Sequence, residues 1–527
     1  MPTLPGNRPA RRPLLRRLRR ADGLTLCGVR RRPVGAGEIH ANREALALYD
    51  QAMAASERAG TPGPERSALL EARADVHSTL GAFEAARADL DAALALAEAA
   101  GDALTRGRLL AALGALWGGH KDYARGLALT RQAVAVIEDT GDHRALAEAR
   151  AGLGIMQLNL AQVDEGRREL EQALQLLAAL GDELGQARTL EMLAMNAWLV
   201  VDVEASIRYA EDAAHRLRDL GDRPTEASAL LTLGAVQTYR AGWRAGEPSL
   251  RRALEIFTAI DAPGGEAYAH VIAAESAMPL GALDLAQREA TACLTIAREI
   301  DHREWTALAL AVLGRTALAC GDVGRARDLH GEMLDIAVKL GTALWIADAH
   351  SGLAEDLVAA GEIAKASEHV AAAIRSAGGA RKFALRPMLL EAELSLRVGE
   401  AARALAAARA AAAYITQWPV QVAECRRVEG EALASLGEVE AAIGALRDAK
   451  AIALTVAATP PHWRATLSLS EVLERAGRRS ESRAEAEEAL RTLEAVAASL
   501  SDPALRTSFE RAGPLVRAHA RRELLRD

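Results

Sequence analysis

Apolar residues recur along the chain at the spacing of an α-helix. In residues 169–180, ELEQALQLLAAL, one stripe is formed by Leu170, Leu174, Leu177 and Leu180. Similar segments of roughly 17 residues follow one another through most of the sequence, and no sustained alternation of β-branched residues interrupts them. The pattern therefore predicts an all-α protein without a β-sheet.

A glycine–aspartate pair separates these segments once every 40 residues, at Gly101-Asp102, Gly141-Asp142, Gly181-Asp182 and Gly221-Asp222. Glycine supplies the left-handed conformation that ends a helix, and aspartate accepts the free backbone N–H groups that begin the next one. A second glycine falls about halfway through most repeats, but the repeats near Ala161 and Val201 lack it. We interpret each pair as the joint between two helical hairpins and predict a right-handed α-solenoid of about eleven hairpins.

Small residues recur inside the first helix of each hairpin, at Gly114, Gly154, Gly234, Gly314 and Gly430. Glycine inside a helix costs about 0.5–1 kcal/mol relative to alanine, so its repetition indicates close approach of two helices. A second series of small residues lies early in the second helix. This pattern resembles the tetratricopeptide repeat, although the usual period is about 34 residues and its aromatic positions are mostly Leu or Ala here.

The longer unit resembles the sensor arrays of bacterial signal-transduction ATPases and transcription activators of the maltose-regulon activator type. The resemblance covers residues 41–527, and it includes the opening stretch 41–60 and the closing stretch 499–518. The sequence contains no GxxxxGK[ST] motif, so the ATPase domain of those relatives is absent. We expect either a free-standing array or a piece of a regulator whose other part is encoded separately.

Three segments follow from this division. Residues 1–40 form an Arg- and Pro-rich flexible leader, residues 41–500 the repeat array, and residues 501–527 a capping helix that begins at Asp502-Pro503. The leader holds ten arginines and two acidic residues, a net charge of +8. Because the whole chain has a net charge of −7, residues 41–527 carry −15. The leader could hold nucleic acid or an acidic partner, or it could be a tail without a structure of its own.

Composition agrees with a helical array in a reducing compartment. Half of the residues are hydrophobic but only 3% are aromatic, so the core must consist largely of Ala and Leu. The four cysteines are scattered and form no CxxC pair. No apolar run reaches the ~20 residues of a membrane span. We expect four free thiols, a cytoplasmic location and no contact with a membrane.

Catalytic and metal-binding motifs are missing from the sequence. The twelve histidines form no HExxH motif and no pair of histidines four residues apart, and His350 is the one placed to face the concave side. There is no GxSxG motif and no Cys–His pairing that the spacing supports. We therefore predict a protein that is not an enzyme, with neither a cofactor nor a metal.

An acidic row marks the candidate binding groove. One position beyond the small residue of each first helix, the last six repeats carry Glu275, Arg315, Glu355, Glu393, Glu431 and Glu471, with Arg427 and Arg464 nearby. If this position faces the concave side, its field favours a basic or zwitterionic peptide. The alternative is a row of solvated glutamates paired four residues along the helix, as in Glu393–Arg397, Arg427–Glu431 and Glu471–Arg475.

Two sets of aromatic residues recur at fixed positions. Trp305, Trp345 and Phe383 begin successive first helices, where we expect core between repeats rather than a ligand platform. At the opposite helix end, Trp117, Trp198 and Tyr239 form either an exposed rim typical of interfaces or packing against the adjacent turn.

Together these features favour a non-catalytic scaffold that binds a protein or peptide on its concave face, in bacterial regulation or signal transduction. The resemblance implies a regulatory ATPase or a DNA-binding protein as the partner. A small-molecule effector sensor of a transcription regulator is the alternative, and an enzyme is a third, disfavoured hypothesis.

Overall fold

The computed structural model describes residues 38–60, 63–79, 82–120, 122–260 and 262–525. Within them the chain is helical throughout, and consecutive helices pack in pairs. The Arg-rich leader lies outside the described residues except for its last three positions. Those three begin α2 (Glu38–Arg58), so the first helix begins earlier than the predicted boundary at residue 41.

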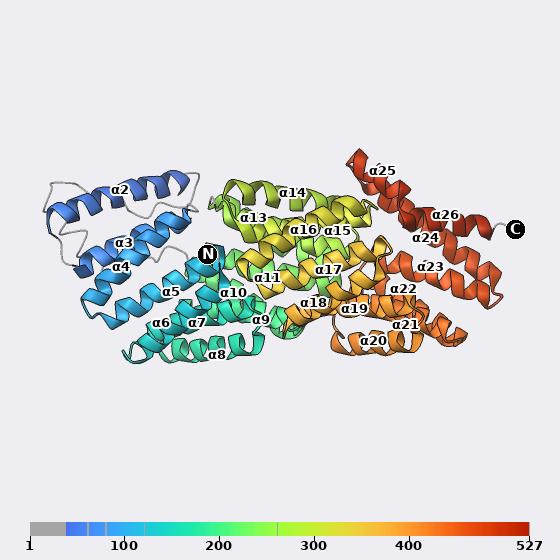
Figure 1. Ribbon diagram of the computed structural model, residues 1–527, viewed down its shortest axis with the longest axis horizontal. Coiled ribbons are helices and arrows are strands. Elements are labelled where there is room, and N and C mark those ends of the chain that lie inside the picture. Colours follow the sequence, from blue (N-terminus) through green and yellow to red (C-terminus); the bar gives the residue numbers. More distant parts are fainter. Residues whose placement is uncertain (1–37, 61–62, 80–81, 121, 261, 526–527) are drawn as a thin grey trace.

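Eleven hairpins follow α2, and they run from one end of an elongated molecule to the other (Figure 1). This confirms the predicted α-solenoid. Their first helices are α3 (Gly63–Thr79), α5 (Ala103–His120), α7 (His143–Asn159), α9 (Glu183–Leu199), α11 (Arg223–Ala241), α13 (Pro263–Ala277), α15 (Arg303–Ala319), α17 (Ala343–Ala359), α19 (Arg381–Arg397), α21 (Pro419–Ser435) and α23 (Thr459–Arg475). Their second helices are α4 (Phe83–Ala99), α6 (Tyr123–Glu138), α8 (Val163–Ala179), α10 (Val203–Leu220), α12 (Trp243–Ala259), α14 (Leu283–Glu299), α16 (Val323–Leu340), α18 (Ile363–Ala377), α20 (Ala401–Tyr414), α22 (Val439–Thr455) and α24 (Arg479–Ser499). A short 3₁₀ helix, η1 (Met278–Leu280), follows α13.

The end of the chain forms two short helices, α25 (Pro503–Arg511) and α26 (Gly513–Leu524), where the sequence predicted one. The N-cap at Asp502 is as predicted, because its carboxylate accepts from the N–H groups of Ala504 and Leu505. Gly513-Pro514 then interrupts the helix, since proline cannot donate the backbone bond that continuation needs. The prediction of one capping helix is therefore wrong, because the segment forms two helices.

The glycine–aspartate joints have the predicted conformations. Gly141 has a φ of +73°, and the Asp142 carboxylate accepts from the N–H of Ala145 at 2.9 Å. Asp222 is different: its side chain makes no cap bond and instead accepts from Arg188 Nε at 2.6 Å, in the preceding hairpin.

Close approach inside the hairpins explains the small residues. A Cβ on Gly154 would lie 2.9 Å from the carbonyl oxygen of Gly166, and one on Gly246 would lie 2.0 Å from that of Gly234. The two helices therefore touch through their backbones at these positions, and Ala at 0% exposure fills the same role in other repeats, as at Ala86 and Ala286.

Successive coils of the superhelix also touch each other. Side chains and backbone about 180 residues apart, or about four and a half hairpins, are hydrogen-bonded along the molecule. These bonds join Tyr123 Oη to Glu304 Oε2 (3.1 Å), Thr342 Oγ1 to Asn159 O (3.4 Å), Thr459 Oγ1 to Leu280 O (3.2 Å) and Ser508 Oγ to Cys320 O (2.7 Å). Repeat periodicity predicts neighbouring contacts only, so this closure was not expected from the sequence.

Candidate functional site

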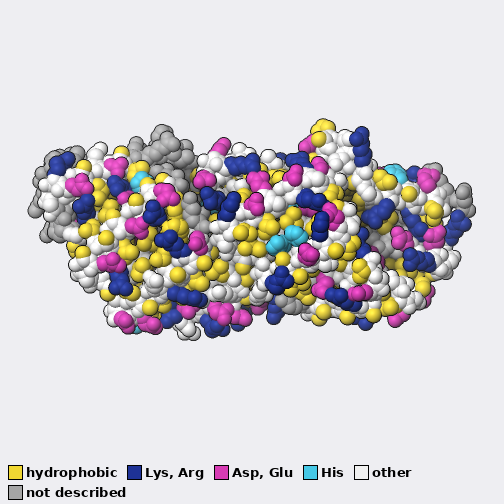
Figure 2. Space-filling model, in the orientation of Figure 1, with side chains coloured by type: hydrophobic (Ala, Val, Ile, Leu, Met, Phe, Trp, Pro, Cys, Tyr) yellow, Lys and Arg dark blue, Asp and Glu magenta, His cyan; other side chains and the backbone are white. Residues whose placement is uncertain are grey.

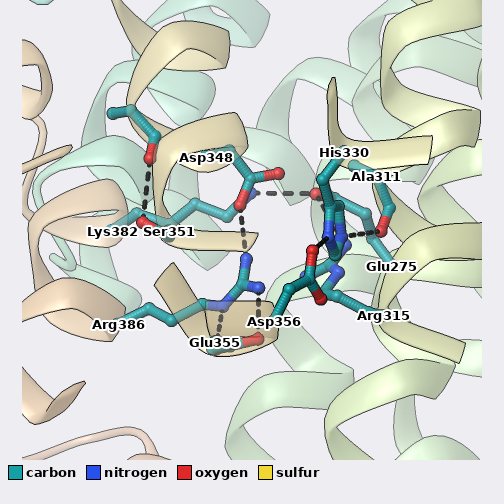
Figure 3. Close-up of polar contacts among 11 residues, drawn as sticks. Glu275, Ala311, Arg315, His330, Asp348, Ser351, Glu355, Asp356, Lys382 and Arg386 are labelled. Atoms are coloured by element: carbon teal, nitrogen blue, oxygen red, sulfur yellow. Dashed lines mark hydrogen bonds and ion pairs between the residues drawn. The ribbon is translucent and has the colours of Figure 1, made fainter. Parts of the chain in front are cut away.

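The first part of the acidic row, Glu275, Arg315 and Glu355, lies in a charged network between the first helices of the later hairpins (Figure 3). Its centre is Arg386 on α19. The Arg386 guanidinium donates to both oxygens of Glu355 at 2.6 Å, and its Nη1 donates to Asp348 at 2.8 Å. Both acids belong to α17, so this fork joins two adjacent hairpins.

Both of these carboxylates are held in the charged form. Burial raises the pKa of Glu355, but the charge and hydrogen bonds of Arg386 outweigh it and leave that pKa lowered. Burial also raises the pKa of Asp348, but the charges of Arg315 and Arg386 lower it by more, so this pKa is lowered as well. Both carboxylates are therefore charged at neutral pH and balance the charge of the Arg386 guanidinium.

A second part of the network surrounds Glu275 on α13. Lys382 Nζ lies 3.4 Å from Glu275 Oε2, and Arg315 Nη2 lies 3.8 Å from Oε1. The Lys382 ammonium also lies 4.0 Å from the ring centroid of Trp198, in cation–π geometry. Lys382 therefore joins α19 to both α9 and α13, a contact between two coils of the superhelix.

His330 and Asp356 complete the cluster drawn in Figure 3. The imidazole Nδ1 and the carboxylate Oδ2 are 2.7 Å apart, and both side chains are fully buried. The ring packs directly on Gly314 and Gly352, where any Cβ would lie within 2.7 Å of a ring atom. Those two glycines thus make room for the imidazole between α15, α16 and α17.

Further along the row, Arg427 on α21 binds three carboxylates. Its Nε donates to Glu424 at 2.6 Å, its Nη1 to Glu431 at 2.8 Å, and its Nη2 to Glu393. Arg464 on α23 donates to the other oxygen of Glu424 at 3.1 Å. Burial disfavours the charged form of both Arg427 and Glu424. Their ion pairs outweigh this effect, so the pKa of Arg427 is raised and that of Glu424 is lowered.

One of these ion pairs was predicted from the sequence. Arg427–Glu431 has the predicted four-residue spacing, whereas Glu393 pairs with Arg427 of the next hairpin and not with Arg397 of its own helix. Pairing across hairpins needs the register of two helices, which the spacing along one helix does not give. The role of the row in ligand binding stays a prediction.

Exposure of the row increases toward the C-terminal end. The side chains of Glu275 and Arg315 are 8% and 14% exposed, those of Glu355, Glu393 and Glu431 are 27%, 28% and 29% exposed, and Glu471 is exposed. The first part of the row is therefore closed within the protein, and the last part is open to solvent.

Of the two alternatives for the second aromatic set, the exposed rim does not form at Trp198 and Tyr239. Trp198 is 5% exposed and Tyr239 is 8% exposed, because the next coil of the superhelix covers them. Tyr239 packs on Trp418 of the later coil with ring centroids 4.9 Å apart. Trp117 is half-buried, against the edge of Phe83 and under the guanidinium of Arg125 at 3.8 Å.

The other aromatic set packs between repeats as predicted. Trp345 and Phe383 meet edge to face at 5.4 Å, and Trp305 stacks on Tyr268 of the preceding hairpin at 4.6 Å. Trp345 Nε1 also donates to Glu304 at 2.9 Å, beside the bond from Tyr123. Burial raises the pKa of Glu304, and these two hydrogen bonds only partly oppose it.

Two shallow hollows lie on the surface of the described part of the chain, and neither touches the acidic row. One of about 300 Å³ lies between α24 and α26, and one of about 450 Å³ lies between α18, α19 and α20. Among the same residues, no three His, Cys, Asp or Glu side chains are grouped to hold a metal ion. None of the helices described is both long and apolar enough to cross a bilayer.

Known proteins share the fold with this chain at low sequence identity. No protein-family model matches the sequence, and no curated protein does. The structure is similar to that of the APC/C hetero-tetramer Cut9-Hcn1, with 14% identity over 92% of this chain and 95% of that one and a TM-score of 0.50. It is also similar to a Rap protein complexed with competence and sporulation factor, with 10% identity over 68% of this chain and 99% of that one and a TM-score of 0.50.

These likenesses show a helical-repeat array of the tetratricopeptide type. At such identities they concern the fold alone. The finer resemblance to activators of the maltose-regulon type stays a prediction.

Proposed function

We propose that this protein is a non-catalytic scaffold whose C-terminal hairpins bind a basic segment of a protein or peptide. The surface in question is the open end of the acidic row, formed by α19, α21 and α23. The observation that carries the proposal is the rise in exposure along the row, which ends in the solvent-exposed Glu471.

Charge at this end suits a cationic ligand. Three carboxylates, of Glu393, Glu424 and Glu431, share two guanidiniums, of Arg427 and Arg464, so the network is net negative by one charge. Glu471 adds a second negative charge. Arg427 is buried beneath the carboxylates, and it holds them in fixed positions, which lowers the entropy lost when a ligand binds.

The structural neighbours support a role in binding other molecules, because their structures were solved as complexes: a hetero-tetramer in one case and an assembly with competence and sporulation factor in the other. By the resemblance in sequence, we propose bacterial regulation or signal transduction as the setting and a regulatory ATPase or DNA-binding protein as the partner. We propose a cytoplasmic location on the same ground and because Cys293, Cys320 and Cys425 are free and buried.

A small-molecule sensor is less well supported. Such sites are usually enclosed apolar cavities with a few polar groups, whereas the hollows found in the described residues are shallow and lie away from the row. The carboxylates of the row and of the arginine network around it have lowered pKa values where a shift is seen, at Asp348, Glu355 and Glu424, which gives no support to proton-transfer chemistry.

Affinity capture from native lysate tests the proposal. We expect the wild-type chain to retain one or a few proteins at low salt and to lose them at high salt, because the contact is charged. The variant Glu393→Gln/Glu431→Gln/Glu471→Gln should reduce the yield of those proteins at least tenfold. The single reversal Glu471→Lys should act in the same direction without affecting folding, since this side chain is exposed.

Exposed glutamates on second helices provide the matched control. The variant Glu204→Gln/Glu211→Gln/Glu299→Gln removes the same charge from α10 and α14. If both triple variants lose the captured proteins equally, the loss is caused by the change in net charge and not by the position of the glutamates. Unchanged capture by the row variant would remove the row from the binding surface.

A further inference from the structure

Two histidines from the two helices of one hairpin turn the same nitrogen toward each other at the surface of the protein. His350 belongs to α17 and His369 to α18, and their Nδ1 atoms are 2.9 Å apart. The ring centroids are 5.0 Å apart and the rings are inclined by 60°. Both side chains are half-buried, and Figure 2 shows histidine side chains at the surface over these helices.

The same two positions hold a nitrogen base and a carboxylate in other hairpins. Nineteen residues separate the partners in each case: Arg150 Nη1 donates to Glu169 at 2.7 Å, and His270 Nδ1 meets Glu289 at 2.7 Å. The first of these contacts is an ion pair between the helices. The hairpin of α17 and α18 has two imidazoles there instead, which have no charge to exchange.

Two imidazole nitrogens that face each other can share one proton or one metal ion. Transition-metal ligation needs both rings in the neutral form. Burial, followed by the charges of His369 and Arg375, lowers the pKa of His350, and burial lowers the pKa of His369 against the charge of Glu368. Both rings are therefore neutral at neutral pH. In the hydrogen bond between them one Nδ1 carries the proton and the other accepts it, so both Nδ1 lone pairs become available to a cation when that proton moves to Nε2 of its own ring.

The spacing of the nitrogens suits one metal ion. Metal–nitrogen bonds are about 2.0–2.1 Å, so two nitrogens on one ion lie about 2.9 Å apart at a right angle and about 3.3 Å apart at the tetrahedral angle. The observed Nδ1–Nδ1 distance of 2.9 Å is that of the hydrogen bond between the rings, and it lies within a few tenths of an ångström of both arrangements. With the centroids 5.0 Å apart the two nitrogens point mostly at each other, so binding needs a small rotation of both rings toward a common point. Imidazole is a preferred ligand of copper, nickel and zinc.

We propose that His350 and His369 form a two-imidazole site for a divalent transition-metal ion of the copper, nickel and zinc class. On binding, both rings carry their proton at Nε2 and donate the Nδ1 lone pairs, so no proton is released. Water completes the coordination, because both side chains reach the surface and the described residues supply no third ligand.

Titration of the metal-stripped full-length chain with Cu²⁺ tests the proposal, because Cu²⁺ binds nitrogen ligands most tightly in this series. We expect one site in calorimetry and hyperfine coupling to two imidazole nitrogens in electron paramagnetic resonance. His350→Gln and His369→Gln should each weaken that site at least tenfold and remove one nitrogen coupling.

Two further variants separate this site from general effects. His270→Gln alters the matching position two hairpins earlier, whose partner is a carboxylate, and should leave the site unchanged. Arg375→Gln removes a positive charge that acts on His350 and should strengthen Cu²⁺ binding severalfold.

Two outcomes would overturn the proposal. One is Cu²⁺ binding by the double variant His350→Gln/His369→Gln with wild-type affinity and stoichiometry. The other is a wild-type spectrum without the two nitrogen couplings, which decides the question even where a variant fails to fold.

Discussion

Individual buried acids in this protein have two different roles that depend on their partners. Glu355 and Glu424 face guanidiniums that lower their pKa values, so both stay charged. Among the described residues, Glu191 and Glu304 accept hydrogen bonds from neutral groups alone, a serine hydroxyl for the first and a phenol and an indole for the second, and burial raises their pKa values. The first pair links hairpins through charge, whereas the second carries an uncompensated desolvation cost at high pH.

Glu304→Gln tests this cost. A carboxyl group with a raised folded-state pKa binds a proton more tightly in the folded chain, so stability falls as pH rises from the ordinary glutamate value through the raised one. Glutamine can accept from Trp345 and donate to Tyr123 without that cost. We expect the variant to match the wild type near pH 5 and to exceed it by on the order of 1 kcal/mol at pH 8. Thermal unfolding at both pH values measures this, and a constant difference between them would contradict it.

At the scale of single helices, the backbone conformation of the joints is kept even where the sequence disfavours it. Where the repeats near Ala161 and Val201 lack the joint glycine, the backbone still takes the left-handed conformation, with φ of +59° and +63°. For a residue with a Cβ this conformation costs about 1–2 kcal/mol, and the β-branched valine is especially unsuited to it. The repeat geometry therefore overrides the local preference of the sequence at these joints.

Exchange of residues between two joints tests that statement. Val201→Gly should raise the free energy of unfolding by about 1 kcal/mol, since the relief of strain exceeds the loss of a half-buried side chain. Gly181→Val should lower it by a similar or larger amount, because Gly181 has a φ of +64° with open space around it. Denaturation of both variants gives the signs, and destabilisation by Val201→Gly would contradict the account.

The sequence predicted the elements well because each signal was local. The stripe of Leu170 and Leu177, the joint at Gly141-Asp142 and the small residue Gly154 each act within one hairpin. The sequence left open whether Trp198 and Tyr239 are exposed or packed, because Lys382 and Trp418, which cover them, come from α19 and from just before α21, in a later coil. The pairing of Glu393 with Arg427 and the contact of His350 with His369 join residues 34 and 19 positions apart. Such pairs depend on helix register, which the sequence pattern alone does not give.

At the scale of the whole molecule, contacts between successive coils set how open the superhelix is. Gly242 lies at one of them, with a φ of +87° and a ψ of 172°, a conformation almost confined to glycine. A Cβ there would lie 2.8 Å from the carbonyl oxygen of Val456, at the end of α22. This residue therefore allows two coils to meet through their backbones.

Gly242→Ala tests the importance of this contact. Strain and the collision with Val456 should lower the free energy of unfolding by about 1–3 kcal/mol and separate the coils, so small-angle scattering should show a longer particle. Gly101→Ala is the control, since it also has a positive φ of +66° but no atom within 4 Å of the added Cβ. Equal effects of the two substitutions would mean that backbone strain, not the contact between coils, determines the result.

Hydrogen exchange on the complex with a partner captured from lysate tests the central claim, that the open end of the acidic row is the binding surface. The account predicts new protection in α19, α21 and α23, greatest near Glu393, Glu431 and Glu471, with little change in α3 to α8. Protection confined to second helices, or to the N-terminal hairpins, would contradict it and place the binding surface elsewhere.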